Sequence, residues 1–300
     1  MTGSGIRCSD ASRARGESLA ATASRVDRWL LVDYAGPWGP KIPWDSRMAR
    51  RTAAHLTYLA NLMGARMLFI RQAFSRREAG GPHRLPDAQQ ARLWWVDCRL
   101  GISRALTVEA RLELEDVGDA DLLGAPLYDR PLVLVCTHGR HDACCAVRGR
   151  RAFTALRGMP GVDVWECSHI GGDRFAGNAV VLPLGVYLGR LDGAEPRRVV
   201  ADLLAGQVQL EHYRGRCTLG RLAQSAEHHV RVRGRLTGLA DVRVVEERPV
   251  GPGKATVRLL TGARHVTVHL VASQDPPEAL TCTSEPARFP RWTVTRVVGG

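Results

Sequence analysis

The order of apolar runs along the chain constrains its fold more than any other feature. Strand-like runs, a loop, helical patterns and a hairpin pattern alternate in one stretch, in the order 131–135 (strand), 136–145 (loop), 146–157 (helix), 162–166 (strand), 179–190 (hairpin) and 196–204 (helix). Apolar residues spaced for strands that alternate with residues spaced for helices are typical of α/β proteins. The sequence therefore predicts an α/β domain over 126–205.

A similar order occurs earlier in the chain. Its runs are a strand at 29–32, a helix at 46–62, a strand at 65–70 and a hairpin formed by 92–98 and 105–110. Two interpretations remain open: a tandem pair of related domains, or a chance recurrence of the common βαββ order. We assign 1–125 to an N-terminal α/β region, with a short helix at 12–23. We assign 206–300 to a C-terminal α+β extension, with a helix at 218–232 followed by strand-like runs.

Composition places the chain among globular proteins, because 45% of its residues are hydrophobic and 24% are charged. The net charge is +12, and arginine supplies nearly all of the positive charge. Arginines are densest at 214–235, which keeps a basic nucleic-acid-binding protein as the weakest alternative. Aromatic residues make up only 6% of the chain, which disfavours a base-stacking surface. We expect no nucleic-acid partner.

The chain has no sequence feature that predicts a membrane partner. Its longest apolar stretch, 178–189, contains Pro183 and Gly185 and is too short to span a bilayer. The first 20 residues contain no apolar run of the kind that forms a secretory signal. Eight cysteines without a small-scaffold spacing then indicate thiols or metal ligands in a reducing compartment. We expect a cytoplasmic protein.

Two loops contain most of the reactive side chains. The first, Cys136-Thr-His-Gly-Arg-His-Asp-Ala-Cys-Cys145, offers three thiols and two imidazoles between a strand and a helix, where thiolates are stabilised. The second, 167–178, follows the next strand and contains His169 and Asp173. We expect both loops to close around one metal centre. A zinc site, an enzyme with a reactive Cys136 or Cys145 thiolate, and buried space-filling cysteines remain alternatives. We interpret the isolated cysteines as space-filling; they are Cys8, Cys98, Cys217 and Cys282.

The runs CTHGRHDACCAVRGR and WECSHIGGDRFAGNAVVLPLGVYLGR resemble the sucrase/ferredoxin-like family of thioredoxin-like ferredoxins. The resemblance is strongest over 131–216. It implies one or two thioredoxin-like domains, a 2Fe–2S cluster and one-electron transfer rather than bond chemistry. Cys136 and Cys145 match the family's first ligand pair, and His169 matches the first member of the second pair. The resemblance gives no basis for sucrase activity, because glycoside hydrolysis needs two facing carboxylates.

The sequence departs from the family pattern at one position. Where one branch of the family has a second histidine and the wider group a cysteine, this chain has Asp173. We predict Cys136, Cys145, His169 and Asp173 as cluster ligands. The other candidates for the fourth position are His138, His141, Cys144 and Cys167. Arginines flank both loops and predict acidic redox proteins as partners; they are Arg140, Arg148, Arg150, Arg151 and Arg174.

Overall fold

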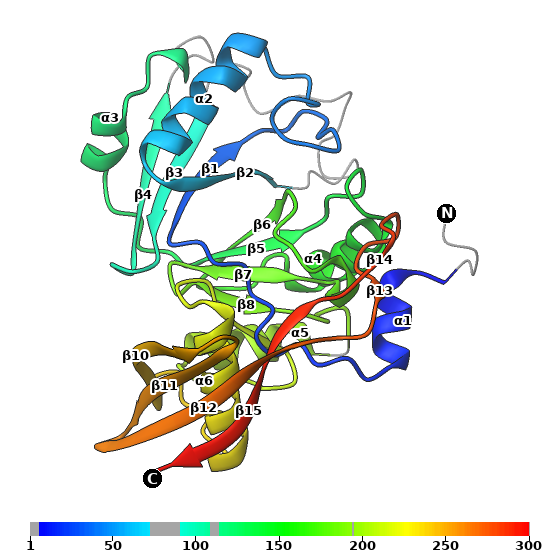
Figure 1. Ribbon diagram of the computed structural model, residues 1–300. Helices are drawn as coiled ribbons and strands as arrows, with labels where there is room; N and C mark the ends of the chain where they lie inside the picture. Colours follow the sequence, from blue (N-terminus) through cyan, green and yellow to red (C-terminus); the bar gives the residue numbers. More distant parts are fainter. Residues whose placement is uncertain (1–5, 73–90, 109–113, 194, 300) are drawn as a thin grey trace.

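The computed structural model describes residues 6–72, 91–108, 114–193 and 195–299 (Figure 1). Within these residues the chain forms six α-helices, one large mixed sheet of nine strands, a separate four-stranded sheet and a two-stranded sheet. The expected mixed α/β architecture is confirmed. None of the described helices is long and apolar enough to cross a membrane.

The first half of the large sheet is built around a parallel pair of strands. β1 (Arg28–Asp33) and β2 (Ala65–Arg71) pair in parallel, and α2 (Arg50–Leu62) connects them. β3 (Ala91–Asp97) is antiparallel to β1, and β4 (Ile102–Val108) is antiparallel to β3 at the edge of the sheet. The order in space is therefore β4-β3-β1-β2.

The second half repeats this arrangement. β5 (Leu132–Cys136) and β6 (Asp163–Cys167) pair in parallel on either side of α4 (Arg150–Leu156), and β7 (Ala179–Leu182) is antiparallel to β5. β8 (Val186–Leu188) is antiparallel to β7. The two halves share the same strand order and the same strand directions. They meet where β2 and β6 pair antiparallel, with Cys167 opposite Ile70.

Apolar clusters lie on both faces of this sheet. α2 covers part of the first half, with Leu56 and Leu59 packed against strand residues such as Phe69. α4 and α5 (Pro196–Leu204) cover part of the second half through Ala152 and Val199. A third cluster contains residues of both halves, including a T-shaped contact between Trp94 and Trp165. The two halves therefore share one continuous core.

The C-terminal region adds a second sheet. β9 (Tyr213–Arg216) pairs with β8 at the end of the large sheet, and α6 (Arg221–Gly234) then packs on a four-stranded sheet through Ala226 and Val230. That sheet has the order β10-β11-β12-β15. The elements that follow α6 are β10 (Val242–Gly251), β11 (Lys254–Thr261), β12 (Arg264–Gln274), β13 (Glu278–Ala279), β14 (Pro286–Ala287) and β15 (Pro290–Val298).

Some element boundaries differ from the sequence prediction. The first helix, α1 (Cys8–Ala14), ends well before the predicted residue 23. The chain after it does not continue as a helix, because the N–H of Thr22 donates to Arg214 and that of Val26 donates to Cys217, contacts that compete with helical hydrogen bonds. α3 (Asp119–Gly124) and β9 were not predicted. The last two residues of the predicted strand 105–110 lie outside the described residues.

Candidate metal centre

The two sequence motifs lie side by side because β5 and β6 are parallel neighbours. Cys136 and Cys167 are the last residues of their strands and occupy paired positions in the sheet. The loops that follow therefore leave the same edge of the sheet, as is usual for ligand sites in α/β proteins. The N–H of Thr137 donates to the carbonyl of Cys167, which ties the starts of the two loops together.

The helix after the first loop approaches the end of β5 very closely. It begins with a π-helical segment, Cys145–Gly149, and continues as α4. A Cβ atom on Gly149 would lie 1.9 Å from the carbonyl oxygen of Cys136, so only glycine allows this approach. π-helical turns are frequent at functional sites. Here the turn places Cys145 beside Cys136, nine positions earlier in the chain.

Donor atoms from both loops converge as the sequence predicted. One ligand atom from each of Cys136, Cys145 and His169 lies within 4.8 Å of the other two. An overlapping group of the same size consists of His141, His169 and Asp173. Asp173 joins the two groups, because Oδ1 of its carboxylate is 3.0 Å from the Cys145 Sγ and 3.0 Å from the His169 Nδ1. The two groups share His169, and the Asp173 carboxylate contacts a member of each.

The centre holds charge although it is buried. The hydrogen bond between the two thiols lowers the pKa of Cys136 well below the ordinary thiol value and raises the pKa of Cys145 well above it. Burial alone lowers the pKa of His169, but hydrogen bonds to Asp173 and Cys136 outweigh it and raise that pKa to about 9. Burial raises the pKa of Asp173, yet contact with His169 leaves it lowered. Without a metal, the centre is therefore a cluster of ion pairs around one imidazolium.

His138 connects the two loops through hydrogen bonds to backbone groups. Its Nε2 lies 2.7 Å from the carbonyl oxygen of Gly39, and its Nδ1 accepts the backbone N–H of His169 at 3.2 Å. The ring also makes a T-shaped contact with Trp38, and burial lowers its pKa. Both ring nitrogens are thus engaged with backbone groups. His138 fixes the second loop to the first but offers no free ligand atom.

His141 and His169 form the edge of the centre that faces solvent. Their rings are stacked with centroids 3.7 Å apart, and the His141 Nε2 lies 3.6 Å from the Asp173 carboxylate. The side chains retain 32% and 23% of their exposure, whereas Asp173 retains 2%. Among the described residues of the centre, the two imidazoles are the side chains that reach its surface.

A buried arginine that the sequence analysis did not assign to the site supports the second loop. The Arg214 guanidinium donates to the carbonyl of Gly171 and to the side chain of Asn178. Gly172 has a φ of +80°, and a Cβ there would lie 2.3 Å from a guanidinium nitrogen of Arg214. Burial lowers the pKa of Arg214 to about 10. The centre thus has a fixed positive charge behind the loop that contains His169.

The basic stretch 214–235 is divided between interior and surface, because Arg221, Arg233 and Arg235 are exposed whereas the other three arginines of the stretch are buried or half-buried. Arg214 and Arg231 are 1% and 0% exposed. Arg231 and Arg216 both contact the buried carboxylate of Glu227, at 3.0 Å and 3.1 Å. The guanidinium groups of Arg216 and Arg231 therefore form ion pairs inside the protein. Packing of α6 against β9 therefore accounts for Arg216 and Arg231, and not for the exposed arginines.

The arginines that flank the two loops fall into two kinds. Three have acidic partners: Arg148 pairs with Asp10 and Asp192, Arg174 with Glu17, and Arg150 with Glu166. Arg140 and Arg151 are exposed. Sequence alone could not separate these kinds, because the partners lie on distant segments.

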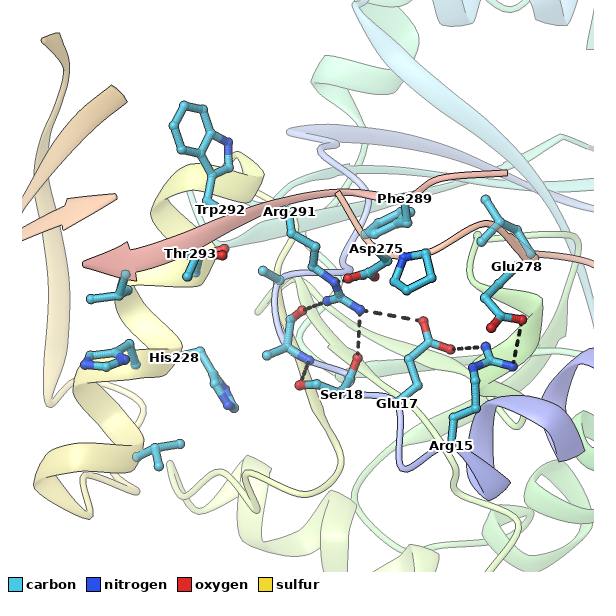
Figure 2. Close-up of a pocket in the computed structure, with 18 of the residues that line it drawn as sticks. Arg15, Glu17, Ser18, His228, Asp275, Glu278, Phe289, Arg291, Trp292 and Thr293 are labelled. Atoms are coloured by element: carbon cyan, nitrogen blue, oxygen red, sulfur yellow. Dashed lines mark hydrogen bonds and ion pairs between the residues drawn. The ribbon is translucent and has the colours of Figure 1, made fainter. Parts of the chain in front are cut away.

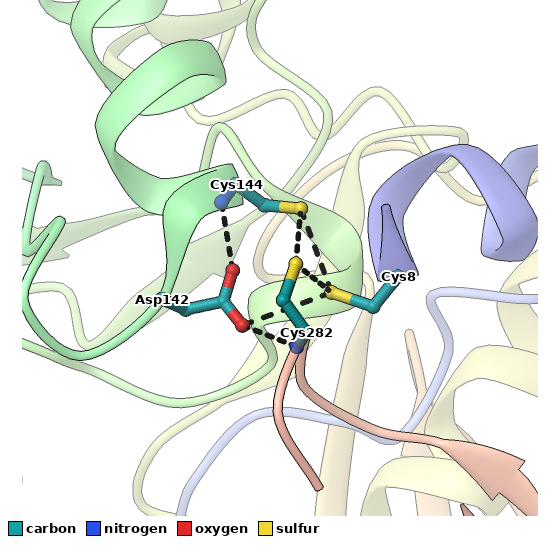
Figure 3. A group of neighbouring side chains, drawn as sticks. All are labelled: Cys8, Asp142, Cys144 and Cys282. Atoms are coloured by element: carbon teal, nitrogen blue, oxygen red, sulfur yellow. Dashed lines mark hydrogen bonds between the residues drawn. The ribbon is translucent and has the colours of Figure 1, made fainter. Parts of the chain in front are cut away.

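The structure also brings together a second cysteine group that the sequence analysis missed. Cys8 and Cys282, which the sequence analysis interpreted as space-filling, lie with Cys144 beside Asp142 (Figure 3). No spacing in the sequence predicts this group, because its members come from both ends of the chain. Cys167 belongs instead to the apolar core and is 0% exposed.

A pocket of about 630 Å³ lies elsewhere, between the segment after α1 and the C-terminal strand β15 (Figure 2). Its charged groups pair with one another, as Arg291 does with Asp275 and Glu17, and Arg15 does with Glu278. None of the candidate ligands, all of which are among the described residues, lines this pocket. It therefore takes no part in the centre.

The family described as sucrase/ferredoxin-like matches residues 19–215. This range contains both loops of the centre, including Cys136, Cys145, His169 and Asp173. It does not contain Cys8 or Cys282. Searches of curated proteins and of solved structures find no match to the chain.

Proposed function

We propose that this chain, which belongs to the sucrase/ferredoxin-like family, holds a 2Fe–2S cluster and exchanges single electrons with redox proteins. The observation that carries the proposal is the convergence of Cys136, Cys145 and His169 within 4.8 Å at the ends of two parallel strands. The repeated strand order supports a tandem pair of thioredoxin-like domains, 1–125 and 126–205, followed by the extension 206–300.

The donor set suits such a cluster. Thiolate and imidazole are the usual protein ligands of 2Fe–2S clusters, and the centre offers both. A bound 2Fe–2S cluster supplies a one-electron couple. With two cysteines, one histidine and one aspartate, the oxidised centre has a formal charge of about −1, against about −2 with four cysteines. Less negative charge favours reduction, so the potential should lie above that of plant-type ferredoxins.

We propose Asp173 as the fourth ligand. Its carboxylate touches both Cys145 and His169 at 3.0 Å, whereas the nearest nitrogen of His141 is 3.6 Å from that carboxylate. His138 is excluded in this conformation by its two hydrogen bonds to backbone groups. His141 is therefore the remaining competitor.

The surrounding residues fit an electron carrier better than a thiol enzyme. Cys136 and Cys145 are 1% and 0% exposed, so a substrate cannot reach either sulfur. An electron needs only a short path through the ring of His141 or His169, which form the solvent-facing edge. Exposed Arg140 beside this edge supports docking of an acidic redox protein.

The main test is to measure iron and acid-labile sulfide per chain, with the visible spectrum, after anaerobic purification. We expect two irons and two sulfides and a red-brown protein. Cys136→Ala should lose both. Cys167→Ala is the matched control, because it removes a buried cysteine at the paired position of the neighbouring strand. A colourless protein without iron after reconstitution would refute the proposal. Zinc lost only from Cys136→Ala would instead identify a zinc site.

Potentiometry on three variants tests the fourth ligand. If Asp173 is a ligand, Asp173→His should raise the potential and Asp173→Cys should lower it, because thiolate donates more electron density than carboxylate. Asp173→Ala should give a labile cluster, while His141→Ala should retain the cluster. If Asp173→Ala keeps a stable cluster and His141→Ala loses it, His141 rather than Asp173 is the fourth ligand.

A further inference from the structure

The thiols of Cys8, Cys144 and Cys282 form a nearly equilateral triangle beside Asp142 (Figure 3). The Sγ atoms of Cys8 and Cys144 are 3.5 Å apart, those of Cys144 and Cys282 are 3.3 Å apart, and those of Cys282 and Cys8 are 3.6 Å apart. A carboxylate oxygen of Asp142 lies 3.9 Å from the Cys8 Sγ. These four donor atoms all lie within 4.8 Å of one another.

The group is buried and is assembled from three distant segments. Cys8 begins α1, Asp142 and Cys144 belong to the first loop, and Cys282 lies between β13 and β14. Cys8, Cys144 and Asp142 are 3%, 0% and 2% exposed, while Cys282 is half-buried. A single buried cysteine can simply fill space, but three thiols that meet beside a buried carboxylate form a donor set that a metal ion would complete.

The spacing suits one tetrahedral ion. Zinc–thiolate bonds of about 2.3 Å in a tetrahedron put neighbouring sulfur atoms about 3.8 Å apart. The observed separations are a few tenths of an ångström shorter, so small side-chain rotations suffice. A disulfide would instead bring two sulfurs to about 2.05 Å and leave the third unpaired. The nearly equal separations favour an ion over a disulfide.

The carboxylate is already oriented. One oxygen of Asp142 accepts the backbone N–H of Cys144 at 2.7 Å, and the other accepts that of Cys282 at 2.6 Å. The second oxygen also faces the Cys8 sulfur. Structural metal sites commonly hold their ligands in place through such outer hydrogen bonds.

We propose that Cys8, Cys144, Cys282 and Asp142 bind a structural Zn²⁺ ion. Three thiolates and one carboxylate complete the four-coordinate shell that closed zinc sites have, with no open position for a substrate. This site is independent of the proposed function, because it shares no ligand with the centre at Cys136, Cys145 and His169.

Its location gives the ion a definite role. Cys144 and Cys145 are adjacent, yet Cys145 faces the first centre and Cys144 faces the second. An ion at the second site would cross-link α1, the first loop and the segment that contains Cys282. It thereby fixes the loop immediately before Cys145. Zinc at this position would stabilise both ends of the chain against the central domain.

The experiment measures zinc and iron per chain by mass spectrometry in the purified full-length protein, Cys282→Ser, Cys136→Ala and Cys98→Ser. Cys98→Ser is the matched control, because Cys98 is half-buried like Cys282 but lies outside both groups. We expect one zinc per chain in the wild type and in Cys98→Ser, and none in Cys282→Ser. Cys136→Ala should retain zinc, whatever happens to its iron.

Two further measurements keep the test decisive if a variant folds poorly. Co²⁺ added to the zinc-free protein should give a thiolate-to-cobalt charge-transfer band that Cys8→Ser removes. Adding Zn²⁺ to the stripped wild type should raise its melting temperature and protect residues after 274 from proteolysis. Absence of zinc even after this addition would overturn the proposal, as would zinc lost from Cys136→Ala but retained by Cys282→Ser. A mass 2 Da below the reduced chain, with a peptide map that joins Cys144 to Cys282, would also overturn it.

Discussion

Replacing His169 by glutamine should change how the stability of the metal-free protein depends on pH. In the folded protein His169 keeps its proton up to about pH 9, because Asp173 and Cys136 stabilise the imidazolium, whereas an ordinary histidine loses it near 6.5. A pKa raised in the folded state stabilises the fold fully below the unfolded value, and the contribution disappears as pH rises through the folded value. The window for this contribution is therefore pH 6.5 to 9.

The magnitude follows from the two pKa values. Each pH unit between 6.5 and about 9 removes about 1.4 kcal/mol, so the imidazolium contributes about 3 kcal/mol at pH 6.5 and little above pH 9. Cys136 works in the opposite direction, because its lowered pKa adds stability as pH rises. The main cause of the lowered Cys136 pKa is the hydrogen bond from Cys145, which His169→Gln leaves in place. In the wild type, the contribution of His169 to the free energy of unfolding falls with rising pH while that of Cys136 grows. In His169→Gln only the contribution of Cys136 remains.

The assay is urea unfolding of the metal-free, reduced protein at pH 6.5 and at pH 9. The free-energy cost of His169→Gln should be about 3 kcal/mol larger at pH 6.5 than at pH 9. His212→Gln serves as the control, because it removes an imidazole of nearly equal exposure, 22% against 23%, outside the centre. A cost of His169→Gln that is the same at both pH values would refute the ion-pair account of the centre.

Three further predictions concern the frame and the surface of the centre. Gly149→Ala should destabilise the protein by about 2 kcal/mol and reduce its iron content, because the added Cβ would overlap the Cys136 carbonyl. Gly124→Ala is the control, since open space surrounds Gly124, and urea unfolding and an iron assay compare the two variants. Glu227→Gln should cost about 3 kcal/mol in urea unfolding, because it leaves Arg231 buried without a counter-charge. Electron exchange with an acidic redox protein should slow between low and physiological ionic strength, and stopped-flow rates that stay flat would exclude steering by the arginines.

The sequence by itself determined the mixed α/β class and predicted where the candidate centre lies. Residue patterns that recur within a few positions report local structure, so the buried strands before Cys136 and Cys167 and the helix after Cys145 were predictable. Parallel strands joined by a helix place their loops at one edge of the sheet. That geometry brought His169 to the two cysteines, and the family resemblance pointed to the same residues.

Only the tertiary structure distinguished residues whose roles depend on distant partners. His138 and His141 are equivalent in the sequence, but a carbonyl at Gly39 engages one of them and leaves the other beside Asp173. The same holds for the arginines, because burial and acidic partners are properties of the packed chain.

The second cysteine group depends most strongly on folding. Its residues lie up to 274 positions apart, so no periodicity or spacing relates Cys8 to Cys282. They meet because α1 packs against the first loop and the segment between β13 and β14 returns to the same place (Figure 1). Local sequence determines which elements form, whereas contacts between the two ends of a chain are decided only when the whole core is packed.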